Sequence, residues 1–396
     1  LPGYAQFLQV VSRDRNDPQG VTWFNSNLVR PSSYVGIRPQ LVAYDVTMAG
    51  AAVGKNVVMP EGSRGGLVRP GRANTFRWYA GDLTGAPAGN GEIAEQPIDL
   101  IATPIEFGGV NLIPGDVIKQ GQKGMVGALV VGPQGASITE NDMVWDHQQT
   151  NQNVLRKTRA SATVAGARDF SVVIQKGLNL RYRDGSPVEN MAAEGQGVPE
   201  DSHDSGQMAI NYGTEPLWFR FGLQPDVPFG RAGEQGSLGA VPNPEMAYSN
   251  ALTGGDPATP VFKVSAGTAV KMHVVEPTGV GRGTTFHLHG HSWQRAPYIC
   301  PGQSDLGLPG RCRWTDFGAA DFEPGSRQIG VNPIGMYLGS QESVTPAAHF
   351  DIFLPGPASP KHGGAGGVHK IKGDYLFRDQ ASFGNTQGLW GIMRVE

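Results

Sequence analysis

The fold is decided by the stretch Phe262-Lys-Val-Ser-Ala-Gly-Thr-Ala-Val-Lys-Met-His-Val-Val275. Gly267 divides it into two runs in which apolar and polar residues alternate. In the second run Val270, Met272 and Val274 fall on one face, with a lysine and a histidine between them on the other. This period of two is typical of a β-strand with one face in a protein core. The stretch therefore predicts two consecutive strands joined by a turn.

The same pattern recurs along the chain and predicts an all-β fold. Stretches rich in glycine and proline separate the segments, and no window of helical period is long enough to favour a βαβ unit. The strand-like segments are residues 40–47, 74–80, 170–181, 217–221, 284–293, 349–354 and 374–378.

Composition agrees with this fold class and argues against two kinds of function. Of 396 residues, 57 are glycine, 30 are proline and 17% are charged, against about 25% charged in an average protein. A net charge of −3 does not favour nucleic-acid binding. The longest apolar runs, such as Met125–Val131, are far shorter than the roughly 20 residues that a membrane-spanning helix needs. We therefore predict no membrane-spanning helix. Because the chain starts at Leu1 without methionine or a leader, we expect a processed chain or a fragment.

An internal repeat predicts two related β-sandwich units. Residues 123–131 (Lys-Gly-Met-Val-Gly-Ala-Leu-Val-Val) parallel residues 387–395 (Gln-Gly-Leu-Trp-Gly-Ile-Met-Arg-Val), and a Pro-Gly turn precedes each. The second unit is longer than a minimal sandwich, so it is expected to contain a large loop insertion. The predicted organisation is a first unit at residues 1–137, a linker at 138–160, and a second unit at 161–396 with its insertion at about 184–257.

One segment carries a chemical signal: Thr284-Thr-Phe-His-Leu-His-Gly-His-Ser-Trp293. On a strand, His287, His289 and His291 would share one face, with alternate residues about 6.6 Å apart. Imidazole is a good ligand for transition metals, and Cu²⁺ binds tightest among the divalent ions. The alternative is that these are ordinary residues of a polar strand face. Three alternating histidines favour the metal site.

This segment resembles the copper-binding strand of multicopper oxidases. Further segments follow in the order that the cupredoxin domains of that family lead us to expect, and together the resemblance covers about two thirds of the chain. The chain also resembles the large multi-domain bacterial copper oxidases, including those that oxidise manganese. The resemblance implies two cupredoxin-like Greek-key β-sandwich domains. The supporting segments are residues 108–131, 169–181, 324–331, 349–354 and 373–395.

The chain departs from the family at most of its copper ligands. The family binds a trinuclear copper cluster with four His-x-His pairs, and a type 1 copper with one cysteine and two histidines. Here only His287 and His289 match such a pair, and Thr284 stands where a type 1 histidine would be. The family's His-Cys-His falls on Arg378-Asp379-Gln380, its next histidine on Gly384 and its axial methionine on Leu389.

These departures limit the function. The chain has 9 histidines, the first of them at position 147, so the first unit supplies none. We therefore expect a copper-binding protein with His287, His289 and, more weakly, His291 as ligands, and no complete oxidase site. By resemblance it would take part in oxidation of a metal ion or small reductant coupled to oxygen, in a homo- or hetero-oligomer with other cupredoxin-type chains. The alternative is a non-catalytic structural or assembly protein built from degenerate cupredoxin domains; a weaker third is a binding module for a surface polymer.

Cys300 and Cys312 bracket a segment rich in glycine and proline. A disulfide closing that loop, worth roughly 3 kcal/mol, is favoured over a thiolate metal site because neither cysteine has a histidine beside it. A disulfide implies an oxidising compartment, so we expect a periplasmic or extracellular protein.

Three lesser clusters contain groups that bind metals, and for each a solvated polar surface is the favoured interpretation. His349 and Asp351 share a strand face and would support a metal site from behind. His362 and His369 lie in a glycine-rich stretch, and residues 200–204 form an acidic cluster suited to Mn²⁺ or Ca²⁺.

Overall fold

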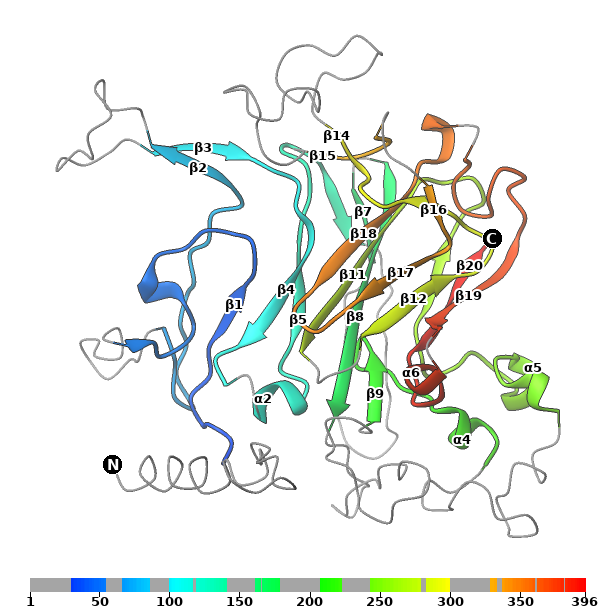
Figure 1. Cartoon of the computed structure of the whole chain (residues 1–396), viewed down its shortest axis with the longest axis horizontal. Coiled ribbons are helices and arrows are strands. Elements are labelled where there is room, and N and C mark those ends of the chain that lie inside the picture. The colour runs from blue at the N-terminus through cyan, green and yellow to red at the C-terminus, as the bar shows by residue number, and fades with distance from the viewer. Residues whose placement is uncertain are drawn as a thin grey trace, which may run out of the picture.

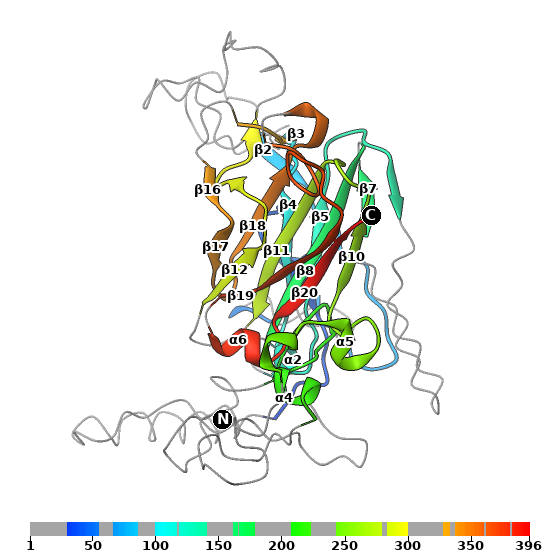
Figure 2. The ribbon, with the colours of Figure 1, turned by 90° about the vertical axis from the view of Figure 1, so that its right-hand side faces the viewer.

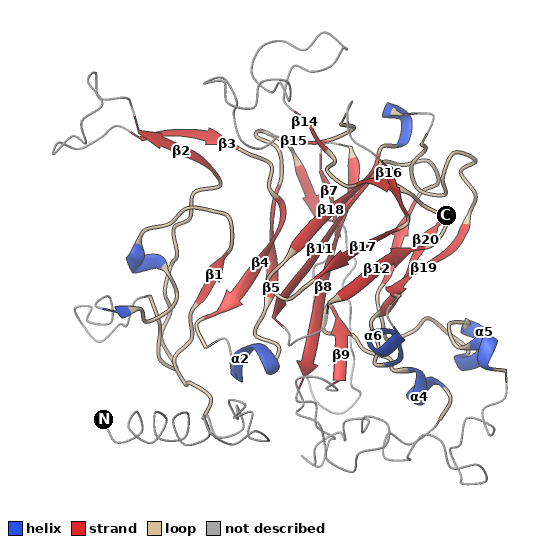
Figure 3. Ribbon diagram, in the orientation of Figure 1, coloured by secondary structure: helices blue, strands red, loops and turns tan. Residues whose placement is uncertain are grey.

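Among the described residues, the three largest β-sheets are stacked one against the next (Figure 1). Strands dominate and the helices are single turns, as Figure 3 shows, so the predicted all-β class is confirmed. The computed structural model describes residues 30–54, 66–85, 100–116, 119–140, 161–164, 166–178, 207–222, 243–278, 283–299, 328–332, 337–359, 362–380 and 382–396.

The first sheet has three strands, and two further sheets form a sandwich. In spatial order the first sheet contains β1 (Ile37–Pro39), β4 (Gly108–Pro114) and β5 (Gly127–Val131). The central sheet contains β18 (His349–Leu354), β11 (Val270–Thr278), β8 (Ala167–Leu178), β7 (Ser161–Val164) and β6 (Ile138–Glu140), with β9 (Gln207–Ile210) paired to β8. The C-terminal sheet contains β10 (Val261–Val264), β20 (Trp390–Val395), β19 (Gly373–Asp379), β12 (Thr284–Leu288) and β17 (Gln341–Val344).

Short pairs and helical turns complete the described structure. The two-stranded pairs are β2 (Gly81–Gly85) with β3 (Leu100–Pro104), β13 (Trp293–Gln294) with β16 (Tyr337–Gly339), and β14 (Tyr298–Ile299) with β15 (Gln328–Ile329). The helices α2 (Lys119–Gln122), α4 (Leu217–Arg220), α5 (Asn250–Thr253) and α6 (Ser382–Thr386) gather at one end of the molecule (Figures 1 and 2). Within the described residues, no helix has the length and apolarity to cross a membrane.

The sandwich core lies between the central and C-terminal sheets and is rich in aromatic rings. Phe262 stacks on Phe170 with centroids 4.6 Å apart and on Phe377 at 5.6 Å, and Phe286 lies 5.8 Å from Phe377. Offset stacks of this kind contribute beyond the burial of their area. Because these rings come from β8, β10, β12 and β19, they fix the two sheets against each other.

Strand β11 is buried on both faces, which its alternating sequence does not reveal. Val270, Met272 and Val274 point into the sandwich core and are fully buried, as the alternation predicts. Lys271 and His273, on the other face, are equally buried because the first sheet covers them. The polar face of this strand is therefore an internal interface between two sheets.

Several predicted strands are confirmed. Strand β18 (His349–Leu354) matches its prediction at both ends. Strand β19 (Gly373–Asp379) extends the predicted 374–378 by one residue at each end, and β8 covers most of 170–181. The two repeat segments both end as strands, β5 and β20.

Two predicted strands near the start of the chain are wrong. Residues 40–47 and 74–80 pair only at the bridge between Ala43 and Tyr79. The carboxylate of Asp45 accepts the backbone N–H of Thr47 at 2.8 Å and caps a 3₁₀ turn, Val46–Met48. This local bond offers the backbone an alternative to a sheet ladder.

Residues 217–221 are also not a strand, because they form the single turn α4 after Pro216. The turn brings the guanidinium of Arg220 to the carboxylate of Glu215 at 2.7 Å and over the ring of Trp390 at 5.0 Å. The same guanidinium donates to the carbonyls of Ala247 and Ser249. This buried contact set ties residues of the predicted insertion to the sandwich.

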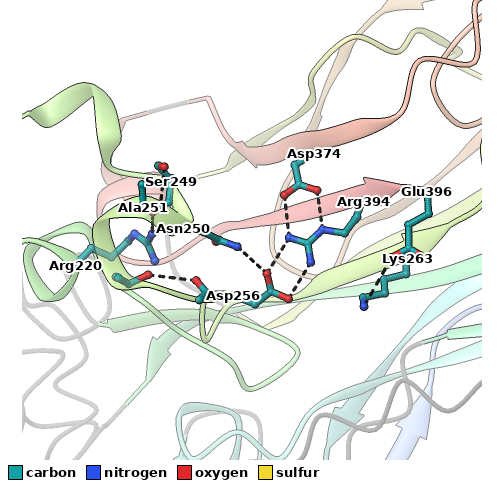
Figure 4. A network of polar contacts seen from close by, with 11 residues as sticks. Arg220, Ser249, Asn250, Ala251, Asp256, Lys263, Asp374, Arg394 and Glu396 are labelled. Carbon is teal, nitrogen blue, oxygen red and sulfur yellow. Dashed lines mark hydrogen bonds and ion pairs between the residues drawn. The ribbon is translucent and has the colours of Figure 1, made fainter.

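A second cluster of polar contacts holds the loop after α5 on the C-terminal sheet (Figure 4). The guanidinium of Arg394 donates two bonds to Asp256, at 2.8 and 2.9 Å, and two to Asp374, at 2.7 and 2.8 Å. The paired geometry is the strongest form of this contact, although water screens groups that are partly exposed. Parts of the predicted insertion thus pack on the second unit, and residues 138–140 of the predicted linker form β6. The division into domains stays a prediction.

Two glycines let the first sheet approach the central sheet closely. A Cβ on Gly109 would lie 2.6 Å from the Cβ of His273, and a Cβ on Gly108 would meet the carboxylate of Asp351. Any larger residue therefore forces the two sheets apart or displaces a buried charge.

We expect Gly109→Ala to lower the free energy of unfolding by about 1–3 kcal/mol, because overpacking a close contact costs that much. Gly255→Ala is the matched control, since a Cβ there would meet nothing within 4 Å. Urea denaturation of both variants measures the difference. Equal midpoints for the two variants would contradict the close packing of β4 on β11.

Candidate metal centre and buried ionic network

His287 and His289 lie together on the C-terminal sheet, as predicted. His287 lies in β12 and His289 directly follows its last residue, and their ring centroids are 4.6 Å apart. We call them the histidine pair. Their spacing allows two imidazoles to face one ion.

Both ring nitrogens of His287 already have partners. Nδ1 lies 3.1 Å from Oε1 of Gln380, and Nε2 lies 3.1 Å from Oγ of Ser340. An amide oxygen only accepts, so Nδ1 carries the proton and donates it, and Nε2 accepts from the Ser340 hydroxyl. A metal would have to replace the hydroxyl at Nε2.

His289 offers a free lone pair. Its Nε2 is enclosed and has no hydrogen-bond partner among the described residues. Burial lowers the pKa of His289, and the charges of His287 and Arg378 lower it further. A neutral imidazole with an unused nitrogen is the form that binds a metal.

His291 does not join the pair, so the expectation of three imidazoles on one face is wrong. Strand β12 ends at Leu288, and Gly290, with φ of 68°, turns the chain. His291 is buried: its Nδ1 donates to the carbonyl of His289 at 2.9 Å, and its Nε2 accepts the N–H of Gly366 at 3.0 Å. Both nitrogens hold backbone groups, which leaves none for a metal.

The positions that match family copper ligands carry other chemistry. Arg378 pairs with His287 across β12 and β19, and the carboxylate of Asp379 accepts the N–H of Thr285 at 2.9 Å. Gly384 lies against Asp379, and Leu389 is part of the sandwich core. Within the described part of the chain, no group of three or more His, Cys, Asp or Glu side chains could hold a metal ion.

The residues present therefore fit one copper ion at most. Two imidazoles, one with an enclosed and unused nitrogen, suit a single ion. They do not fit a trinuclear cluster, which the family builds from about eight histidines, and no thiolate is described near them. Cys300 and Cys312 lie outside the described residues, so their disulfide stays a prediction.

The most connected polar site was missed by the sequence analysis. His273 on β11 is fully buried, with Nδ1 2.6 Å from Asp351 and Nε2 3.4 Å from Asp169. Asp351 also accepts the hydroxyl of Tyr298 at 2.7 Å and the N–H of Gly109 at 3.0 Å. We call Asp169, His273, Asp351 and Tyr298 the buried network.

Burial alone would lower the pKa of His273, but the two carboxylates outweigh it and raise this pKa to about 9. His273 is therefore an imidazolium at neutral pH. The same burial, and the neighbouring charge of Asp351, raise the pKa of Tyr298 well above its usual value, so its hydroxyl keeps its proton.

Two more buried ion pairs flank this network. Lys271 on β11 pairs with Glu106, which also accepts the N–H of Ile329 at 2.7 Å. Lys176 on β8 lies 2.9 Å from Glu276, and burial raises the pKa of Glu276 to about 7 although the lysine opposes this. The sequence does contain a signal for such contacts. Lys271 and His273 alternate on β11 with the same period as the acidic residues on the strands that pair with it, such as Asp351 on β18.

The lesser candidates separate in the structure. Asp351 belongs to the buried network, and His349, at the end of the same strand face, is half-buried with a lowered pKa caused first by burial. His362 is exposed and stacks on Tyr337 with centroids 3.8 Å apart, and His369 is also exposed. The acidic cluster at 200–204 lies outside the described residues.

Comparison with known proteins finds likeness in fold and none in sequence. No protein-family model and no curated protein matches the chain. Among solved structures, a multicopper oxidase is 12% identical with a TM-score of 0.38, the match covering 92% of this chain and 70% of that one. A copper nitrite reductase from Nitrosomonas europaea is 11% identical with a TM-score of 0.37, covering 92% and 75%. A blue copper oxidase from the same organism is 13% identical with a TM-score of 0.32, covering 78% and 63%. These values establish neither a family nor an activity.

We predict that stability falls as the pH rises through the titration of His273. Its pKa is about 9 in the folded chain and about 6.5 when unfolded, so the unfolded state binds fewer protons between these values. The free energy of unfolding should therefore drop by about 2 kcal/mol from pH 7.5 to 9. Denaturant titrations at several pH values measure this slope.

His273→Gln should flatten this slope. Glu276→Gln is the control: it removes a group that titrates near pH 7 and should leave the slope above pH 7.5 intact. A slope that survives His273→Gln would show that another group titrates.

Proposed function

We propose that the chain binds one copper ion through His287 and His289, and that it works in an oxidoreductase system only together with further chains or domains. The observation that carries the proposal is the enclosed, unpartnered Nε2 of His289 beside a second imidazole. A buried nitrogen with no partner is costly unless a ligand satisfies it. Copper, when bound, supplies one-electron redox chemistry.

The surrounding residues would orient the pair for a metal. The bond from Nδ1 of His287 to Gln380 holds the ring in the tautomer whose Nε2 has a lone pair. Ser340 occupies that lone pair with a hydroxyl, which is exchanged more easily than a charged group. The lowered pKa of His289 keeps its ring neutral at neutral pH.

The same surroundings argue against a complete oxidase within this chain. Arg378 lies opposite His287 in the position that matches a family ligand, and a guanidinium repels a copper ion. The oxidation of a metal ion or small reductant, coupled to oxygen, would then need copper ligands from other cupredoxin-type chains in a homo- or hetero-oligomer. We place this assembly in the periplasm or outside the cell, where a Cys300–Cys312 disulfide would form.

A non-catalytic structural or assembly protein is the second candidate. It is favoured by the two existing hydrogen bonds of His287 and by the positive charge of Arg378 nearby. On this alternative the histidine pair is a polar surface of the sheet, and the chain carries no metal.

The purified chain, loaded with copper and then desalted, should retain about one copper ion per chain. His287→Ala combined with His289→Ala should abolish that retention, because each ring supplies one of two ligands. Elemental analysis measures the copper content. The absorption spectrum should lack an intense blue band, because no thiolate ligand lies near the pair.

Two controls make the result specific. His362→Ala removes an exposed ring elsewhere and should leave copper retention unchanged. His291→Gln tests the third predicted ligand and should also leave it unchanged, since both its nitrogens bind the backbone. Retention that survives loss of the histidine pair, or that is absent from the unaltered chain, favours the structural candidate.

A further inference from the structure

Arg378 is a partly buried guanidinium without a partner in the described structure. Two other arginines at this sheet are paired with carboxylates: Arg394 binds Asp256 and Asp374, and Arg220 binds Glu215. Arg378 itself has no ion pair or side-chain hydrogen bond with another described residue. Within the described part of the chain, its positive charge therefore has no carboxylate partner.

The carboxylates closest to Arg378 in sequence are already engaged. Asp374, four residues earlier on the same face of β19, is bound at both oxygens by Arg394. Asp379 points to the opposite face, where it is buried and accepts the N–H of Thr285. Neither is free to turn toward Arg378 without breaking an existing bond.

The histidine pair borders this guanidinium. Arg378 pairs with His287 in the ladder between β19 and β12, and its charge reaches the ring of His289. On its other side its charge also reaches the phenol of Tyr248, which packs on Trp390. The guanidinium of Arg378 thus lies between the two imidazoles of the histidine pair and the aromatic ring of Tyr248.

We propose that the guanidinium of Arg378, at the border of the histidine pair, binds a small oxyanion such as phosphate or a phosphate monoester. The guanidinium presents a planar fork of N–H donors that matches two oxygens of such an anion. This site needs no metal, so it goes beyond the copper proposal, although it borders the same two histidines.

The test measures phosphate binding by the full chain after treatment with a chelator. Isothermal calorimetry gives the affinity, and the ring signals of the histidines in NMR spectra report the location. Arg378→Gln should weaken binding at least about tenfold, because a charge-assisted pair is lost. Arg69→Gln, which removes an exposed arginine from the first unit, is the matched control and should have no effect.

Two further arms complete the test. Repeating the measurement with methyl phosphate shows whether the site prefers free phosphate or a phosphate monoester. Binding of either anion that depends on Arg378 supports the proposal. Arg378→Lys keeps the charge without the fork, should bind with intermediate affinity, and shows that the sheet tolerates substitution. The proposal is overturned if phosphate binds Arg378→Gln as it binds the unaltered chain, or if neither anion binds the unaltered chain.

Failure of this proposal and failure of the copper proposal give different results. If the histidine double variant loses copper retention while Arg378→Gln leaves phosphate binding unchanged, the copper proposal stands and the oxyanion proposal falls. If phosphate binding depends on Arg378 in a chain that retains no copper, the oxyanion proposal stands and the copper proposal falls.

Discussion

The arrangement of the sheets depends on the buried, protonated imidazole of His273, which lies between two carboxylates. His273 lies on β11 in the central sheet, with Asp351 on β18 and Asp169 on β8 as its neighbours. Burying any one of these charges alone costs several kcal/mol, so the strands that carry them must meet in one register. Gly109 extends this requirement to the first sheet, because its N–H reaches Asp351 and its missing side chain leaves room for His273.

The two faces of the central sheet are held to their neighbouring sheets by different forces. Between the central and C-terminal sheets, stacked rings such as Phe262 and Phe377 exclude water, and the contact is hydrophobic. Between the central and first sheets the apolar cluster around Val275 is small, and buried ion pairs such as Lys271 with Glu106 fill much of the interface. The histidine pair lies on the C-terminal sheet, whose strands the aromatic core positions.

How far the sequence could predict this protein depends on whether a pattern is local. The strand at His349–Leu354 was predicted to the residue because alternation is a property of neighbours in the chain. Residues 217–221 were predicted as a strand and form a helical turn, because the contacts of Arg220 with distant carbonyls decide their conformation. His291 lies away from the histidine pair for a similar reason: the N–H of Gly366, 75 residues away, binds its Nε2.

The sequence by itself determined the all-β class, the alternation of β11 and the closeness of His287 to His289, since each follows from the two-residue period of a strand. Tertiary structure alone decided that the polar face of β11 is an interior and that His273 is charged. It also brought Arg378 beside the histidine pair. The physical reason is that burial and Coulombic interaction depend on distance in space, and residues such as Asp169 and Asp351 come together only when their strands pair across β11.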